Sequence, residues 1–146
     1  MNSFVFEDAL KLVLALITGG FIGMEREYRS KAAGFRTMIL IAIGSTLFTM
    51  ISVRIGAPAS MDRVAANIIT GIGFLGAGVV FKDSTSVTGL TTAASIWATA
   101  SLGMAIGIGE YQLAFFGLLL VITVLALFEK VQIWIEHFNQ KHKIGR

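Results

Sequence analysis

Five long apolar stretches divide the chain, and short polar segments separate them. They cover roughly residues 5–24, 35–53, 64–81, 90–109 and 111–128. About 20 mostly apolar residues are needed for a helix to cross the hydrocarbon core of a bilayer. Near-continuous apolar runs favour helices over a membrane barrel, whose strands alternate apolar and polar residues. The pattern predicts an all-α integral membrane protein, a bundle of five transmembrane helices.

The third and fourth stretches are rich in glycine and other small residues. In lipid, helices associate through close backbone approach and interhelical hydrogen bonds, and small residues allow both. We therefore expect these two helices to form the packed centre of the bundle. Because each glycine lowers helix propensity by about 1 kcal/mol relative to alanine, a kink or local unwinding of the third helix is an alternative. The predicted helix-packing motif comprises Gly71, Gly73, Gly76, Gly78, Gly89, Thr91, Thr92, Ser95, Trp97, Thr99 and Gly103.

A helical pattern continues after the fifth stretch. Val131, Trp134, Ile135 and Phe138 follow the spacing i, i+3, i+4 and i+7. This spacing predicts a short amphipathic helix at the membrane surface, with Trp134 as its anchor, and a partner-binding role for it stays open. The chain is accordingly divided into a transmembrane domain, residues 1–128, and an interfacial tail, residues 129–146.

Composition places the chain in the membrane class and narrows its chemistry. Apolar residues make up 55% of the sequence, charged residues 14%, and the mean hydropathy is +0.77, whereas the surface of a soluble domain needs more charge. There is no cysteine, which excludes disulfides, thiolate metal sites and a cysteine nucleophile. P-loop, HExxH and GxSxG motifs are absent as well. We therefore expect neither an enzyme nor a cofactor.

Basic residues are distributed unequally between the polar segments. Nine lie in the connection 25–36, near residue 82 and in the tail, against three on the opposite side, at positions 11, 54 and 63. By the positive-inside rule, the N-terminus lies outside and the C-terminus in the cytoplasm. The net charge of +3 is thus an orientation signal and not a sign of nucleic-acid binding.

Ionisable and polar residues gather at the ends of the predicted spans. The cytoplasmic cluster comprises Glu25, Arg26, Arg36, Thr37 and Asp83. Two interpretations stay open: interfacial ion pairs that orient the helices, or a vestibule where a carboxylate meets a cation or proton. The identity of any metal is unknown.

On the outer side, Arg63 and Asn67 lie on one face of the third helix. A carboxamide about one turn inside the membrane needs hydrogen-bond partners. Asn67 therefore either joins two helices or lies on a solute path.

Three segments resemble the MgtC/SapB family of bacterial inner-membrane proteins. They read GMEREYRSKAAGFRT, RVAANIITGIGFLGAGVVF and VTGLTTAASIWATASLGMAIGIG, and the similarity extends from about Gly19 to Gly109. Asn67 stands where many relatives carry glutamine. The positions that match the family motif are Glu25, Arg26, Gly34, Arg36, Thr37, Arg63, Gly71, Gly73, Phe74, Gly76, Gly78, Gly89, Leu90, Thr91, Thr92, Trp97 and Gly103.

The resemblance implies a role in adaptation to low magnesium, to acid stress and to survival inside host cells. For virulence-associated members it also implies restraint of the proton-translocating ATP synthase. The chain stops soon after the fifth stretch, so we expect a short member without the soluble C-terminal domain of longer ones.

Two function classes follow from these observations. One is a non-enzymatic regulator that contacts another membrane protein, and the other is an oligomeric channel or transporter for Mg²⁺ or protons. Under both, we expect a homo-oligomer, most simply a dimer, embedded in the bilayer.

The orientation is testable with reporter fusions. Because the basic residues divide nine to three, reporters in the connection 25–36 and at residue 146 should lie in the cytoplasm. A reporter at residues 56–60 should lie outside. Finding all three on the same side would refute the five-span topology.

Overall fold

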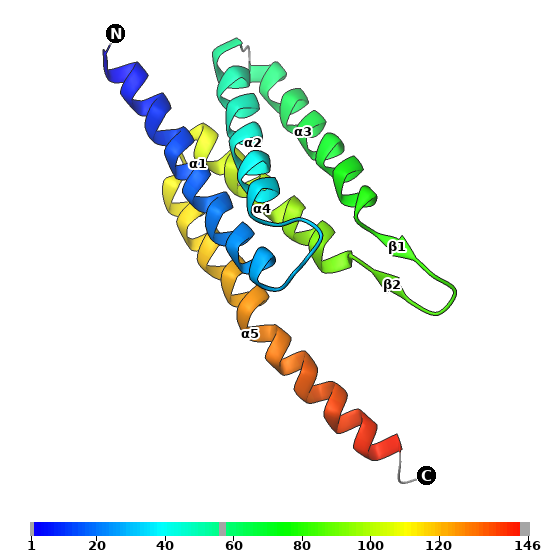
Figure 1. Ribbon diagram of the computed structural model, residues 1–146. Coiled ribbons are helices and arrows are strands. Elements are labelled where there is room, and N and C mark those ends of the chain that lie inside the picture. The colour runs from blue at the N-terminus through cyan, green and yellow to red at the C-terminus, as the bar shows by residue number, and fades with distance from the viewer. Residues whose placement is uncertain (1, 56–57, 144–146) are drawn as a thin grey trace.

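A computed structural model describes the backbone of residues 2–55 and 58–143, and the side chains of residues 5–55 and 63–128. These residues form five helices joined by short turns, together with one two-stranded hairpin (Figure 1). The predicted all-α class is confirmed, since the chain is 83% helical. The hairpin was not expected. In chain order the elements are α1 (Asn2–Tyr28), α2 (Phe35–Ile55), α3 (Pro58–Gly78), β1 (Phe81–Lys82), β2 (Val87–Thr88), α4 (Leu90–Ile108) and α5 (Tyr111–Lys143).

Among the described residues, three helical segments are long and apolar enough to cross a membrane. They are Phe35–Ile55, Leu90–Ile108 and the first part of α5, Tyr111–Phe128. Arg63–Ala77 within α3 is a shorter apolar helix. These helices support a membrane protein, and five crossings stay a prediction.

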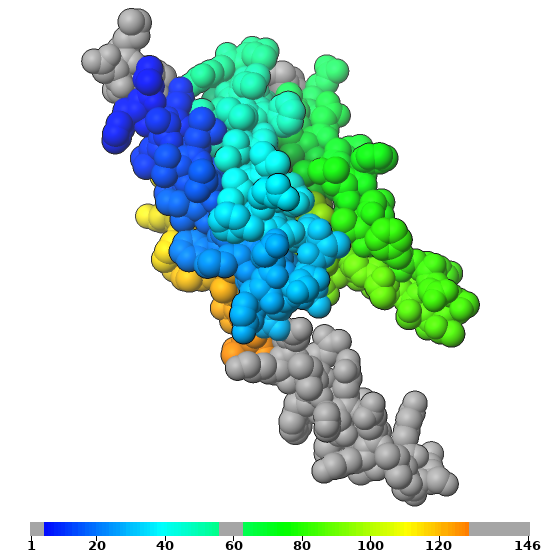
Figure 2. All heavy atoms as spheres, viewed as in Figure 1, coloured from blue at the N-terminus to red at the C-terminus, as the bar shows by residue number. Residues whose placement is uncertain are grey.

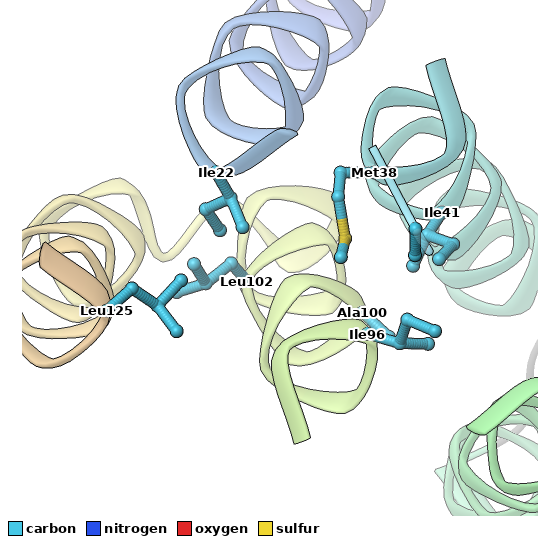
Figure 3. Packing of buried hydrophobic residues seen from close by; sticks show 8 residues of the cluster. Ile22, Met38, Ile41, Ile96, Ala100, Leu102 and Leu125 are labelled. Atoms are coloured by element: carbon cyan, nitrogen blue, oxygen red, sulfur yellow. The ribbon is translucent and has the colours of Figure 1, made fainter. Parts of the chain in front are cut away.

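Helix α4 is central to the bundle and packs against each of the other four helices. Figure 3 shows the core on two sides of α4. On one side Leu102 lies near Ile22 of α1 and Leu125 of α5, and on the other Ile96 lies near the α2 residue Ile41. The expectation that the fourth stretch forms the packed centre agrees with this arrangement.

Helices α1 and α2 cross at two glycines of α1 that were not singled out from the sequence. A Cβ atom at Gly19 would lie 2.6 Å from the backbone oxygen of Met38, and one at Gly23 would lie 2.7 Å from the Cα of Phe35. Side-chain carbons do not approach other atoms so closely. The two backbones are therefore in direct contact, as in helix pairs that associate through glycines four residues apart.

Further along α2, nearly the same face meets α4 in the same manner. A Cβ at Gly103 would lie 2.5 Å from the backbone oxygen of Ala42, and one at Gly107 would lie 2.6 Å from the Cβ of Thr49. The buried hydroxyl of Thr46 donates a hydrogen bond of 2.8 Å to the backbone oxygen of Gly103. Close approach and an interhelical hydrogen bond thus occur at one crossing, the combination that favours helix association in lipid.

The placement of α3 corrects the expectation for the third stretch. Figure 1 shows α3 beside α2 at the periphery of the bundle. A Cβ at Gly71, Gly73 or Gly78 would meet no atom within 4 Å, and Gly76 alone of these four glycines approaches a neighbour, with Ala93 at 3.6 Å among the described residues. The helix is continuous from Pro58 to Gly78. Glycine content alone does not show whether a helix is central or peripheral, because a glycine face can pack against lipid or another chain.

A short hairpin joins α3 to α4. Phe81 pairs with Thr88 and Lys82 with Val87 in antiparallel register. Gly89 follows with a φ of 87°, and a Cβ there would overlap the backbone oxygen of Val79. Glycine is therefore required where the hairpin meets α4, for both its backbone angle and its lack of a side chain.

Helix α5 continues without interruption across the predicted boundary between residues 128 and 129, and its last part extends beyond the bundle (Figure 1). The tail is thus helical to Lys143. The Trp134 side chain, predicted to anchor the tail, is not among the described side chains. The amphipathic character of the tail therefore stays a prediction.

The α2–α4 crossing is testable by filling it. Gly103→Leu should lower the unfolding temperature of the detergent-solubilised protein, because overpacking typically costs about 1–3 kcal/mol. Gly73→Leu is the matched control, since a Cβ at that position meets no atom within 4 Å. Equal unfolding temperatures for the two variants would contradict the crossing.

Candidate functional site

A cluster of charged side chains lies at the C-terminal end of α1. The carboxylate of Glu25 forms ion pairs with the guanidinium groups of Arg26 and Arg29. Nη2 of Arg29 also donates a hydrogen bond of 3.3 Å to the backbone oxygen of Ala126 in α5. The cluster therefore connects the end of α1 to α5.

Arg26 is buried to an unusual degree for an arginine, with 2% of its surface exposed. Its Nη1 has no hydrogen-bond partner among the described residues. A buried charge is tolerated only when it is paired, because desolvation of an ion costs several kcal/mol. Glu25 is the ionic partner of this guanidinium, so the two residues depend on each other.

The turn after α1 holds this cluster close to the start of α2. Ser30 adopts a left-handed conformation with a φ of 52°. The backbone N–H of Lys31 donates to the backbone oxygen of Arg26 at 3.0 Å, which closes the end of the helix. The chain then reverses direction within a few residues.

Glu27, which also lies at this end of α1, has a structural role that was not predicted from the sequence. Its Oε2 accepts a hydrogen bond of 3.0 Å from the backbone N–H of Phe35, one of the unpaired donors at the start of α2. A side chain at Gly34 would overlap that carboxylate. The sequence offered only a weak sign of this contact, an acidic residue before the turn and a glycine just before α2. The hydrogen-bonded residues are eight positions apart and on opposite sides of the turn, so their spacing does not indicate the contact.

The other predicted cytoplasmic residues do not join the Glu25 cluster. Arg36 and Thr37 are exposed on the first turn of α2. Arg36 lines a shallow recess with Glu27 and Tyr28. Asp83 lies in the exposed hairpin turn, where its Oδ1 accepts a hydrogen bond of 2.7 Å from the backbone N–H of Ser84. The predicted grouping of five residues is thus divided among three places.

Arg63 and Asn67, which were predicted to lie on the outer side, are both exposed on α3. Asn67 makes no hydrogen bond to any residue whose side chain the structure describes. It lines a groove between α2 and α3 with a volume of about 640 Å³, and Thr37 lines the same groove. Figure 2 shows α2 and α3 side by side on one face of the molecule.

The residues of the predicted packing motif also fall into two groups. Thr92, Ser95, Thr99 and Gly103 are buried in the bundle, whereas Thr91 and Trp97 are exposed, Trp97 by 55%. The predicted packing motif is therefore only partly buried within the described chain. Among those same residues, no group of three or more histidine or acidic side chains is arranged to hold a metal ion.

Comparison with known proteins places these features in a family. The sequence profile of the MgtC family matches residues 12–134. The chain belongs to the MgtC family. The match includes the charge cluster of α1, the groove and all of α4.

Three relatives illustrate the similarity. The protein named "Putative magnesium transporter YhiD" of Escherichia coli K12 is 44% identical over 133 residues, which cover 86% of this chain and 62% of the relative. Protein MgtC of Brucella abortus strain 2308 is 43% identical over 113 residues, which cover 77% of this chain and 48% of the relative. Protein MgtC of Salmonella typhimurium is 42% identical over 108 residues, which cover 74% of this chain and 46% of the relative. The chain thus spans about half to two thirds of these relatives. No solved structure matches it.

Replacing Glu25 tests the charge cluster. Glu25→Gln leaves the Arg26 guanidinium buried without its ionic partner, so we expect a loss of about 3 kcal/mol or more in stability. Glu7→Gln makes the same change at an exposed carboxylate, which lies 3.3 Å from Lys11, so we expect a smaller loss there. Thermal unfolding in detergent measures both variants. Equal, small effects would show that Arg26 does not depend on Glu25.

Proposed function

We propose that this MgtC family member is a non-enzymatic regulator in the bacterial inner membrane, where it acts in magnesium homeostasis and stress adaptation by contact with another membrane protein. The names of its relatives and the resemblance described above support the physiological setting. The proposal includes five membrane crossings, with the N-terminus outside and the C-terminus in the cytoplasm.

The observation that carries the proposal is the open face of α3. Ala66, Thr70, Gly73 and Ala77 follow a spacing of four, three and four residues, and all four are exposed. Beside them, Phe74 is 81% exposed. The glycines of α1 and α4 that lie at helix crossings are closed by neighbouring atoms, whereas Gly73 meets none within 4 Å.

This face has the properties of a helix interface that lacks its partner. Small residues allow another helix to approach the backbone closely, and a neighbouring aromatic side chain supplies contact area. The Thr70 hydroxyl already donates to the backbone oxygen of Ala66 at 2.9 Å, so the face requires no further hydrogen bond. We call the four small residues the outer face of α3.

The arrangement of polar residues favours a regulator over a conductor. A conducting route needs polar groups along one continuous passage. Glu25 instead lies in the α1 cluster, Asp83 in the hairpin, and Asn67 beside the groove. The conductor stays the alternative, because one relative carries magnesium transport in its name.

The outer face of α3 also gives the proposed homodimer a location. The small residues Ser95, Thr99 and Gly103 of α4 offer no such surface, since they are buried inside the bundle. The partner is therefore either a second copy or a different membrane protein. The family resemblance makes ATP synthase the first candidate to test.

Two measurements on purified protein test the proposal. Liposomes that contain the protein should stay impermeable to protons and Mg²⁺, and the candidate partner should co-purify with the wild type. Gly73→Leu should reduce the co-purified partner about tenfold, the effect of ~1.4 kcal/mol. Crosslinking of two differently tagged copies distinguishes a homodimer from a second protein.

Gly71→Leu is the matched control for this experiment. It makes the same change on the same helix, about 200° around the axis from Gly73, and should retain the partner. An ion flux that Glu25→Gln or Asp83→Asn abolishes would overturn the regulator in favour of the conductor. If both leucine variants bind the partner equally well, the outer face of α3 is not the contact surface.

A further inference from the structure

We propose that a second copy of this chain covers the outer face of α3, and that Trp97 of each copy packs over Gly73 of the other. The inference rests on the proposed function, because it names the partner at the same face. Its basis is an exposed tryptophan, an open glycine at the same depth, and the two-fold symmetry that brings them together.

Trp97 projects from an exposed side of α4. It is 55% exposed, and the residues one turn away on the same side, Ala94 and Ser101, are small and exposed as well. Trp97 follows Leu90, the first residue of α4, by seven positions, or about 10 Å along the helix. Its indole N–H has no hydrogen-bond partner among the residues whose side chains the structure describes. Tryptophan is typical of the membrane surface, where this N–H reaches an acceptor, so a lipid chain is a poor neighbour for it at this depth.

Gly73 lies at the same depth as Trp97. Helices α3 and α4 run in opposite directions, because the hairpin joins them (Figure 1). They meet where a Cβ at Gly76 would lie 3.6 Å from the Cβ of Ala93. From that contact, three residues back along α3 reach Gly73, and four residues forward along α4 reach Trp97. These steps correspond to about 5 Å and about 6 Å in the same direction.

The two residues also lie on the same side of the α3–α4 contact. A helix turns about 100° per residue, so Gly73 lies about 60° around α3 from Gly76, and Trp97 about 40° around α4 from Ala93. Both rotations follow the winding of their own helix, and because the helices are antiparallel, both lead to the same side. Trp97 does not cover Gly73 within one chain, since a Cβ at Gly73 would meet no atom within 4 Å.

A two-fold axis along the membrane normal exchanges these two positions. Such an axis keeps both copies in one orientation and leaves the depth of each residue unchanged. When it passes in front of the α3–α4 contact, Trp97 of one copy faces Gly73 of the second copy, and the reverse contact forms as well. A projecting side chain and an open glycine on one face are thus self-complementary, as a closed two-fold dimer requires. This symmetry favours a second copy over a different protein.

Thr70 supplies the acceptor that the indole lacks. Its hydroxyl donates to the backbone oxygen of Ala66 at 2.9 Å, which leaves the lone pairs of the hydroxyl oxygen free to accept. Thr70 lies three residues from Gly73 on the outer face of α3. The N–H of Trp97 from the second copy can therefore donate to it, which a lipid chain at the same place does not allow.

The face has enough exposed area for a stable contact. Phe74 is 81% exposed and Trp97 is 55% exposed, so the two side chains present roughly 270 Å² per copy at about 200 Å² for an aromatic side chain. A stable interface buries about 800 Å² per partner. The two aromatic side chains thus supply about a third of it, and Ile69, Leu90 and the small residues between them provide the remaining exposed surface.

The experiment measures self-association of the intact chain. Two differently tagged copies are co-expressed and extracted in mild detergent, and their co-purification is measured over a range of protein concentrations. Trp97→Ala should weaken self-association about thirtyfold, the effect of ~2 kcal/mol that is typical of an interface anchor. Phe116→Ala is the matched control, because it removes a 62% exposed aromatic side chain from α5 and should leave self-association unchanged. Unchanged unfolding temperatures confirm that both variants are folded.

Two further variants test the individual contacts. Trp97→Phe keeps a ring but removes the N–H, so it should weaken self-association about fivefold, the effect of ~1 kcal/mol for one hydrogen bond. Gly73→Leu fills the space that Trp97 of the second copy occupies. Combined with Trp97→Ala, it no longer meets that side chain, so the double variant should associate no more weakly than Gly73→Leu alone.

Three results decide the inference. Equal self-association of the wild type and Trp97→Ala would overturn it, and so would a double variant whose loss is the sum of the two single losses. If the tagged copies do not associate but Gly73→Leu still loses another co-purified membrane protein, the inference is wrong and the proposed function stands. Self-association that depends on Trp97, without any other bound protein, would support the inference and contradict the proposed function alone.

Discussion

Close backbone contact between helices is the constraint on which this bundle depends. In lipid, apolar surfaces gain little by leaving an apolar solvent, so packing density and interhelical hydrogen bonds hold the helices together. Helix α2 meets α1 at Gly19 and Gly23 and meets α4 at Gly103 and Gly107. These crossings position the three helices, and the Thr46 hydrogen bond joins two of them directly. The charge cluster and the α2–α3 groove both take their geometry from this arrangement.

The bundle divides into a closed part and an open part. Helices α1, α2, α4 and α5 share buried cores, and the Glu25 cluster connects α1 to α5 at one end. Helix α3 contributes few buried residues, and glycines on two of its faces meet no neighbour. Faces that are open to lipid or to another protein therefore lie on α3. This division is why we assign the proposed protein contact to α3.

The sequence identified most residues of the candidate site, but it did not show which of them lie together. Glu25, Arg26, Arg36 and Asp83 were each identified from their positions at the ends of apolar stretches. The structure joins the first two with Arg29 and separates the others. Depth along the membrane follows from position in a span, whereas direction around the bundle depends on how each helix is rotated. That rotation is set by contacts between helices, which spacing along one chain does not reveal.

The sequence by itself determined the membrane class, the helical content and the family, because hydropathy over about 20 residues reports directly on the solvent of a segment. It also identified glycine as the packing residue. Only the tertiary structure decided which glycines lie at helix contacts. Gly103 and Gly107 lie at the crossing with α2, whereas a Cβ at Gly71 or Gly73 would meet no neighbouring atom within 4 Å. The physical reason is that glycine permits close approach without attracting any particular neighbour, so its contact depends on which helix the rest of the bundle brings to it.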